Sequence, residues 1–99
     1  MISTHVLDTT RGEPAVAVPV RLERLGDDWE LVAQGVTDGD GRLRDWLPPG
    51  AGRYRLVFDI GADAFFPEVV ITFAVTDPAR HLHVPLLLSP YGYTTYRGS

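Results

Sequence analysis

The three histidines are the side chains of this sequence best suited to acid–base chemistry near neutral pH. The ordinary pKa of histidine, about 6.5, lets an imidazole accept a proton and return it, as a general base must. His81 and His83 are two positions apart, so on a β-strand they project from the same face. His5 shares its side of an N-terminal strand with Ser3 and Leu7. These spacings favour a histidine-based site, although a histidine in a small β-protein is more often structural or simply exposed.

Other kinds of reactive site find less support. The absence of cysteine removes a thiol nucleophile, a thiolate metal site and any disulfide. The His81–His83 pair is compatible with zinc if a third histidine completes the set, but nothing in the spacing forces His5 to meet the pair. A serine hydrolase is disfavoured because no Gly-x-Ser-x-Gly motif occurs. We therefore expect no metal or cofactor, and zinc is the alternative.

A glycine- and aspartate-rich segment in the middle of the chain precedes an arginine. Residues 37–41 (TDGDG) resemble the start of a calcium loop, but the remaining ligands and the distal glutamate are missing, so a turn is the better interpretation. Arg42 follows this turn directly. There its guanidinium could hold a planar anion through two hydrogen bonds. An ordinary surface arginine is the alternative.

The elements that must position these residues are predicted to be strands. The 10 glycines and 8 prolines are spread along the chain, and both residue types are unfavourable inside helices. Apolar side chains alternate with other residues over five stretches, at 16–22, 29–33, 54–60, 69–75 and 82–88. The connections are too short for crossover helices. The sequence therefore predicts one domain, residues 1–99, folded as an antiparallel β-sandwich with at most one short helix, at 61–66.

The strand near the C-terminus has an unusual second face. Opposite its core-facing residues it carries only neutral side chains, namely His81, His83, Pro85, Leu87 and Ser89. A neutral surface of this kind is usually covered. A domain of 99 residues has no third layer to offer, so another subunit is the expected cover. A partly exposed neutral face is the alternative.

Composition and charge exclude several partners. The chain is 44% hydrophobic and 22% charged, which is typical of a globular domain. Its formal net charge of -4 argues against nucleic acid or an anionic membrane as a partner. No apolar run approaches the roughly 18 to 20 residues that span a bilayer. The N-terminus lacks the features of a signal peptide and the C-terminus a typical peroxisomal tripeptide, so we expect a cytoplasmic location.

Several segments together closely resemble the 5-hydroxyisourate hydrolases, the transthyretin-related enzymes of urate breakdown. They are residues 3–9 (STHVLDT) with 11–15 (RGEPA), 37–42 (TDGDGR), 65–68 (FFPE) and 83–99 (HVPLLLSPYGYTTYRGS). The last is the most specific, because hormone-carrying transthyretins are similar in fold but lack its Tyr-Arg-Gly-Ser ending. The segment 60–64 is shorter than in many relatives, where it often carries a helix, so we expect a stunted helix or a plain loop.

The resemblance implies a transthyretin-like β-sandwich assembled as a homotetramer, a dimer of dimers, with active sites in the channel between the dimers. It implies hydrolysis of the cyclic amide of 5-hydroxyisourate to 2-oxo-4-hydroxy-4-carboxy-5-ureidoimidazoline, without a metal. The residues carried over as catalytic are His5, Arg42, His83 and Ser99. Those carried over as contacting the substrate are His5, Arg42, Tyr96, Arg97 and Gly98. His81 lies beside the motif and is not expected to be catalytic.

In the chemistry that the resemblance implies, either His5 or His83 accepts a proton from the attacking water. The other histidine orients that water or protonates the departing ring nitrogen, while Arg42 holds the substrate and offsets charge on oxygen. Tyr96 and Ser99 supply hydrogen bonds that set the position of the substrate. The alternatives are a small-molecule carrier that uses the same channel, an interaction module of the carboxypeptidase regulatory-domain kind, and a zinc hydrolase. The terminal tetrapeptide favours the enzyme.

Overall fold

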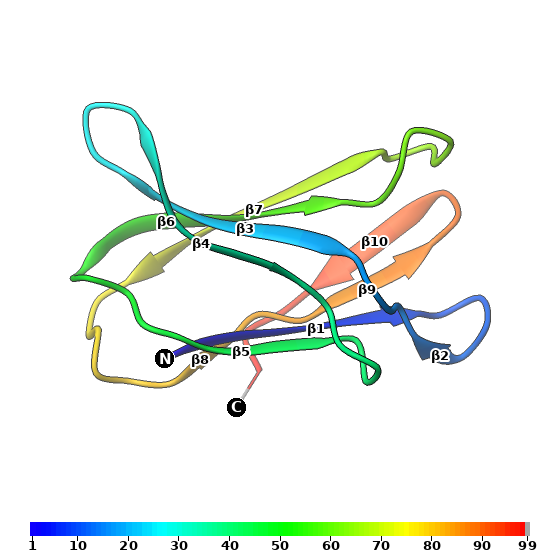
Figure 1. Cartoon of the computed structure of the whole chain (residues 1–99), viewed down its shortest axis with the longest axis horizontal. Helices are drawn as coiled ribbons and strands as arrows, with labels where there is room; N and C mark the ends of the chain where they lie inside the picture. The colour runs from blue at the N-terminus through cyan, green and yellow to red at the C-terminus, as the bar shows by residue number, and fades with distance from the viewer. Residues whose placement is uncertain (99) are drawn as a thin grey trace.

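The computed structural model describes residues 1–98, which form two β-sheets packed face to face (Figure 1). The strands are β1 (Ile2–Asp8), β2 (Glu13–Pro14), β3 (Pro19–Leu25), β4 (Trp29–Val36), β5 (Arg42–Trp46), β6 (Gly52–Asp59), β7 (Glu68–Val75), β8 (Leu82–His83), β9 (Leu86–Ser89) and β10 (Gly92–Thr95). The predicted β-sandwich is confirmed. Within the described part of the chain no helix is long and apolar enough to cross a membrane.

The first sheet is built around β1. The antiparallel strands β5 and β2 follow one another along one edge of β1, and the parallel strands β8 and β9 follow one another along the other edge. The outermost strand, β10, pairs with β9. The parallel pairs depart from the wholly antiparallel arrangement that we expected. Because β1 and β8 lie near opposite ends of the chain, no short hairpin constrains their relative direction.

The second sheet has the order β4-β3-β6-β7, and all of its pairs are antiparallel. Its inner face supplies much of the core, with Leu22, Leu56, Phe58 and Val69 fully buried. The core-facing side chains predicted for β6 and β7 are confirmed, because Tyr54, Leu56, Phe58 and Val69 are buried. Val57, on the other side of β6, is buried as well, at 2% exposure. The first sheet packs against this inner face.

The strand β1 divides its side chains between the core and the outer surface. Ile2 and Val6 are completely buried, and Thr4 is 1% exposed with its hydroxyl donating to the carbonyl of Val84 at 2.6 Å. Since successive side chains of a strand point to opposite faces, Ser3 and His5 lie on the outer face of the sheet. The buried side chains of β1 therefore fix the backbone that carries Ser3 and His5 on the outer face.

Two local expectations need correction or refinement. The segment 61–66 forms turns and bends rather than a helix. The strand predicted at 82–88 is divided into β8 and β9, with Val84 and Pro85 between them. Proline has no N–H for the strand ladder, which accounts for the interruption. The inward-facing residues of this stretch, Leu82, Val84 and Leu86, are buried as predicted.

Candidate active site

The pairing of β1 with its two neighbours brings the predicted site residues together. His5 lies opposite Arg42 in the antiparallel pair of β1 and β5. Ser3 lies opposite His83 in the parallel pair of β1 and β8. Because Ser3 and His5 are two residues apart, their side chains and those of their partners share the outer face of the sheet. Two imidazoles and a guanidinium from three separate segments therefore meet on one surface.

The imidazole of His83 is anchored by a serine. Its Nδ1 lies 2.8 Å from Oγ of Ser3, and the same Oγ lies 3.3 Å from Nε2 of His81. Ser3 is only 8% exposed, whereas His81 is exposed and His83 half-buried. The expectation that His81 and His83 share a face is confirmed. The hydrogen bond at Nδ1 leaves Nε2 as the ring nitrogen that can meet a ligand.

The environment of His83 favours its neutral form. Burial lowers the pKa of His83 below its usual value, and the nearby charges of Arg42, His5 and His81 lower it further. Arg42 and His81 line the same cavity as the His83 ring. A neutral imidazole can accept a proton at pH 7, which is the state that a general base requires.

The segment 37–41 is a turn, as predicted, and it positions Arg42. The carboxylate of Asp38 accepts hydrogen bonds from the backbone N–H groups of Asp40 and Arg42, each at 2.9 Å. These two bonds lower the pKa of Asp38. The backbone N–H of Asp38 in turn donates to the carbonyl of Arg42 at 3.0 Å. Arg42 therefore leaves the turn with its backbone held in place.

Gly41 joins this turn to β1. Its φ is +75°, and an added Cβ would lie 2.5 Å from the carbonyl oxygen of Val6. The carbonyl of Gly41 also accepts the N–H of Val6 at 2.8 Å. Only glycine combines this conformation with such a close approach. The turn that carries Arg42 is thereby fastened to β1 one residue after His5.

The C-terminal segment reaches the site at Gly98. The N–H of Gly98 donates to the carbonyl of His83 at 2.8 Å, and the two residues form an isolated antiparallel bridge. Gly98 also lines a cavity of about 530 Å³, together with Arg80, His81, Tyr96 and Arg97. The position of Gly98 beside His83 agrees with the expected place of the terminal tetrapeptide. Ser99 lies outside the described residues.

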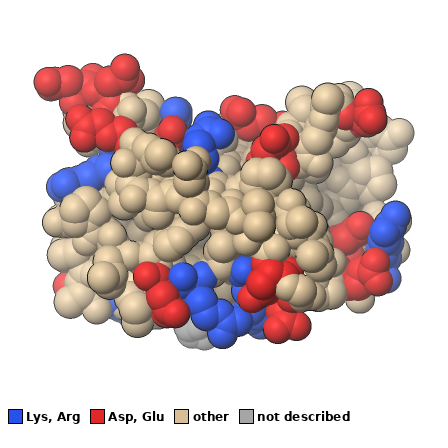
Figure 2. Space-filling model, viewed as in Figure 1, with Lys and Arg blue, Asp and Glu red and all other residues tan. Residues whose placement is uncertain are grey.

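A neighbouring cavity of about 380 Å³ is lined by several of the candidate imidazole and guanidinium groups. Its wall includes Ser3, Arg42, Arg44, His81 and His83, while His5 does not line it. His81 borders both this cavity and the one beside the C-terminal segment. Basic side chains, flanked by acidic ones, lie on the side of the molecule where β1, β5 and β8 run (Figures 1 and 2), and the wall of this cavity also includes Asp45. The surroundings suit a planar, electron-rich or anionic ligand.

The zinc interpretation gains no support from the arrangement of the donors. Across residues 1–98, no group of three or more His, Cys, Asp or Glu side chains is placed to hold a metal ion. The facing nitrogens of His81 and His83 are instead engaged by the hydroxyl of Ser3. These residues therefore do not fit a three-histidine zinc site.

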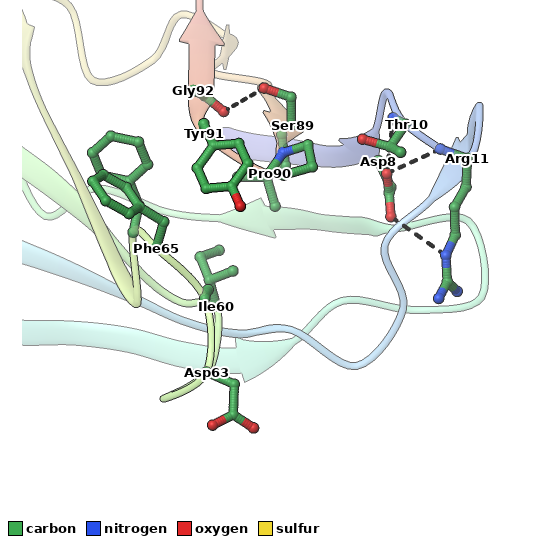
Figure 3. A pocket seen from close by; sticks show the side chains of 13 residues that line it. Asp8, Thr10, Arg11, Ile60, Asp63, Phe65, Ser89, Pro90, Tyr91 and Gly92 are labelled. Carbon is green, nitrogen blue, oxygen red and sulfur yellow. Dashed lines mark hydrogen bonds and ion pairs between the residues drawn. The ribbon is translucent and has the colours of Figure 1, made fainter.

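A larger cavity, of about 630 Å³, lies at the opposite end of the sandwich, where the loop after β6 meets the β9–β10 turn (Figure 3). Phe65 makes edge-to-face contacts with Phe66 and Tyr91, with ring centroids 4.8 and 5.8 Å apart. Asp8 and Arg11 form an ion pair at its rim, at 3.9 Å. Neither a histidine nor any predicted site residue lines this cavity. The histidines and the other predicted site residues within the described part of the chain therefore lie away from this cavity.

Sequence reasoning missed two residues that position the site. From the sequence, Ser3 is only a neighbour of His5 on one side of a strand, and Asp38 only part of a turn or calcium loop. The signal for Ser3 was present, because it shares a strand face with His5. Its contact with His83 was not readable, since the two residues are joined only by the pairing of β1 and β8.

Comparisons with known proteins identify the family of this chain. Residues 2–98 match the model of the HIUase/Transthyretin family. A 5-hydroxyisourate hydrolase of Salmonella typhimurium is 44% identical over 110 residues, covering 100% of this chain and 81% of the relative. The solved structure of Klebsiella pneumoniae 5-hydroxyisourate hydrolase has a TM-score of 0.87 and 38% identity, covering 99% of this chain and 97% of that one. Sea bream transthyretin in complex with thyroxine has a TM-score of 0.87 and 30% identity, covering 98% and 93%.

Proposed function

Because the chain belongs to the HIUase/transthyretin family, we propose that it is a hydrolase of 5-hydroxyisourate that acts in urate catabolism. The observation that carries this proposal is the pairing of His5 with Arg42 and of Ser3 with His83 on either side of β1. This arrangement supplies a proton acceptor, a second imidazole and a fixed cation on one surface. These groups can assist hydrolysis of a cyclic amide, because an imidazole can move protons and a cation can stabilise charge on the carbonyl oxygen.

The fold alone does not separate a hydrolase from a carrier, because the hydrolase and transthyretin structures share a TM-score of 0.87 with this chain. The side chains of the candidate site distinguish a hydrolase from a carrier. A carrier needs a shaped channel, whereas a hydrolase needs groups that move protons and stabilise charge. The neutral imidazole of His83 beside Arg42 favours the hydrolase.

His83 is the better candidate for the general base. The hydroxyl of Ser3 occupies its Nδ1, and its lowered pKa keeps the ring neutral near pH 7. In the proposed step Nε2 of His83 takes a proton from water while the water oxygen bonds to the ring carbonyl carbon. The carbon–nitrogen bond then breaks, and the departing ring nitrogen receives a proton. His5 is proposed to deliver that proton or to orient the water.

Arg42 and the C-terminal segment are proposed to bind the substrate. The guanidinium of Arg42 offsets the charge that develops on the carbonyl oxygen when water adds. Tyr96, Arg97 and Gly98 lie in the wall of the adjoining cavity, where they are available to contact the rest of the ring system. Ser99 is assigned to this group from the family resemblance.

We propose that the assembly is a homotetramer, a dimer of dimers, and that neighbouring subunits close the site. Support comes from the outer face of the first sheet, where neutral side chains such as Leu87 and Thr94 lie opposite each other across β9 and β10. Tyr96, which continues this strip, is 58% exposed. Surfaces of this kind are covered in assemblies. Analytical ultracentrifugation is expected to give four chains per particle, and a monomer would contradict the proposal.

The direct test follows the absorbance of freshly generated 5-hydroxyisourate with and without the protein. The wild-type chain is expected to accelerate its decay, and His5→Ala and His83→Ala are each expected to lose most of this activity. Activity that persists after treatment with a chelator would separate the mechanism from a zinc-dependent one. Near-normal turnover in both histidine variants would show that the proposed chemistry is wrong.

A further inference from the structure

The hydroxyl of Ser3 links two imidazoles, one half-buried and one exposed. Ser3 Oγ lies 2.8 Å from Nδ1 of His83 and 3.3 Å from Nε2 of His81. The serine itself is 8% exposed, so water has little access to compete for its hydroxyl. So far Ser3 has been described only as occupying Nδ1 of His83, and His81 has been given no role in the reaction.

We propose that Ser3 is a positioning residue whose hydroxyl, anchored on His81, holds His83 in the tautomer with its proton on Nδ1 and with Nε2 free. The catalytic consequence rests on the proposed hydrolase function. The hydrogen-bonded arrangement itself does not.

A serine hydroxyl has one proton and two lone pairs, so it can donate to only one of the two imidazoles. When it donates to one ring and accepts from the other, two arrangements follow. When it donates to Nε2 of His81, it accepts from Nδ1–H of His83, and Nε2 of His83 is unprotonated. When the direction is reversed, His83 carries its proton on Nε2. Only the first arrangement makes His83 a base toward the cavity.

The charges around His83 favour the first arrangement. Arg42 from β5 lines the same cavity and presents only N–H donors, so a lone pair on Nε2 is more favourable near it than an N–H. His5 from β1 and His81 from the segment before β8 also act electrostatically on the ring. Arg44 and Asp45 of β5 line the same cavity. Burial lowers the pKa of His83, and the charges of Arg42, His5 and His81 lower it further, so the neutral ring is favoured.

The same bond also stabilises the product of the proton transfer. When Nε2 takes a proton from water, the ring becomes a cation and its Nδ1–H remains directed at Ser3 Oγ. That hydrogen bond is then charge-assisted and therefore stronger. The hydroxyl does not have to rotate during the step, because its own proton stays on His81.

Nitrogen-15 NMR of the full chain at about pH 8, where ordinary histidines are neutral, reads the tautomer directly. The wild-type protein is expected to show His83 protonated on Nδ1. Ser3→Ala is expected to shift His83 toward the Nε2–H form and to lower kcat by roughly 10-fold to 100-fold with little change in KM. Ser3→Thr keeps the hydroxyl and is expected to restore both. Ser89→Ala makes the same change at the far end of the sheet, where Ser89 donates to Gly92, and should alter neither.

His81 offers a second variant that does not depend on the folding of the Ser3 variants, because its side chain is exposed. His81→Leu removes the acceptor for the serine hydroxyl and is expected to shift the tautomer in the same direction, with a several-fold lower kcat. His81→Gln supplies an amide oxygen as acceptor and should retain more of the Nδ1–H form.

The outcomes separate the two proposals. A wild-type His83 protonated on Nε2 overturns the inference, as does an unchanged tautomer in both Ser3→Ala and His81→Leu. Failure of the wild-type chain to hydrolyse 5-hydroxyisourate overturns the proposed function and its catalytic consequence. The tautomer measurement decides the hydrogen-bonded arrangement in either case.

Discussion

The backbone of Gly98 lies directly against the imidazole ring of His83. An added Cβ at position 98 would sit 2.6 Å from Cδ2 of His83 and 3.2 Å from its Cγ. The N–H of Gly98 meanwhile donates to the carbonyl of His83 at 2.8 Å, which prevents the chain from moving away without losing this bond. A shift of either Gly98 or the His83 ring therefore requires a shift of the other.

Gly98→Ala is expected to reduce activity far more than stability. The new methyl group displaces either the His83 ring or the C-terminal segment, and a misplacement of about 1 Å at a catalytic group costs on the order of 100-fold in rate. The midpoint of thermal unfolding should change little, because position 98 lies outside the core. Gly39→Ala is the matched control, since a Cβ there meets nothing within 4 Å. Equal activity in the two variants would contradict the proposed role of this contact.

Gly41→Ala is expected to destabilise the protein by about 3 kcal/mol or more, because left-handed strain adds to a clash with the carbonyl of Val6. Gly12→Ala separates the two effects, because Gly12 has a similar φ of +69° but open space around its Cβ position. Strain alone should cost that variant about 1 kcal/mol. Denaturant unfolding of both variants measures the difference. Equal losses would show that the close approach to β1 contributes nothing.

Arg42→Lys is expected to lower kcat/KM by roughly 100-fold. Lysine keeps the charge but loses the planar pair of donors, and removal of one well-placed donor to a developing oxyanion has about this effect. Steady-state assays with 5-hydroxyisourate measure the change. Arg53→Lys, an exposed position on the second sheet, is the matched control and should retain full activity.

The pH dependence of activity should report the lowered pKa of His83. A base must be neutral, so kcat/KM is expected to fall as the pH drops through a pKa that lies below the ordinary histidine value of about 6.5. Arg42→Gln removes a cation that lowers this pKa, so an NMR titration of His83 in that variant should move to higher pH. A titration unchanged by the substitution would contradict the placement of Arg42 beside the ring.

The same shift has a consequence for stability. Because the pKa of His83 is lower in the folded state, its contribution to stability is present above about pH 6.5 and is lost as the pH falls through the folded pKa. His83→Gln is expected to remove this dependence. Unfolding free energies measured from about pH 8 to pH 5 test this, with wild type and variant diverging toward the upper end of that range.

Much of the fold followed from patterns within single strands. Alternation at 54–60 and 69–75 correctly predicted the core-facing side chains of β6 and β7, and the glycines and prolines correctly argued against long helices. The same local period placed His81 and His83 on one face, where both contact Ser3. These predictions succeed because the direction of a side chain depends only on its position along its own strand.

Which strands pair with one another, and in which direction, could not be predicted from these local patterns. Nothing local requires β8 to run parallel to β1, or His83 to lie opposite Ser3 rather than beside another residue. The contact of Gly98 with His83 and the approach of Gly41 to Val6 likewise join segments that are distant in sequence. Such pairings are chosen by the packing of whole sheets against a common core, a long-range effect that no short stretch of residues contains.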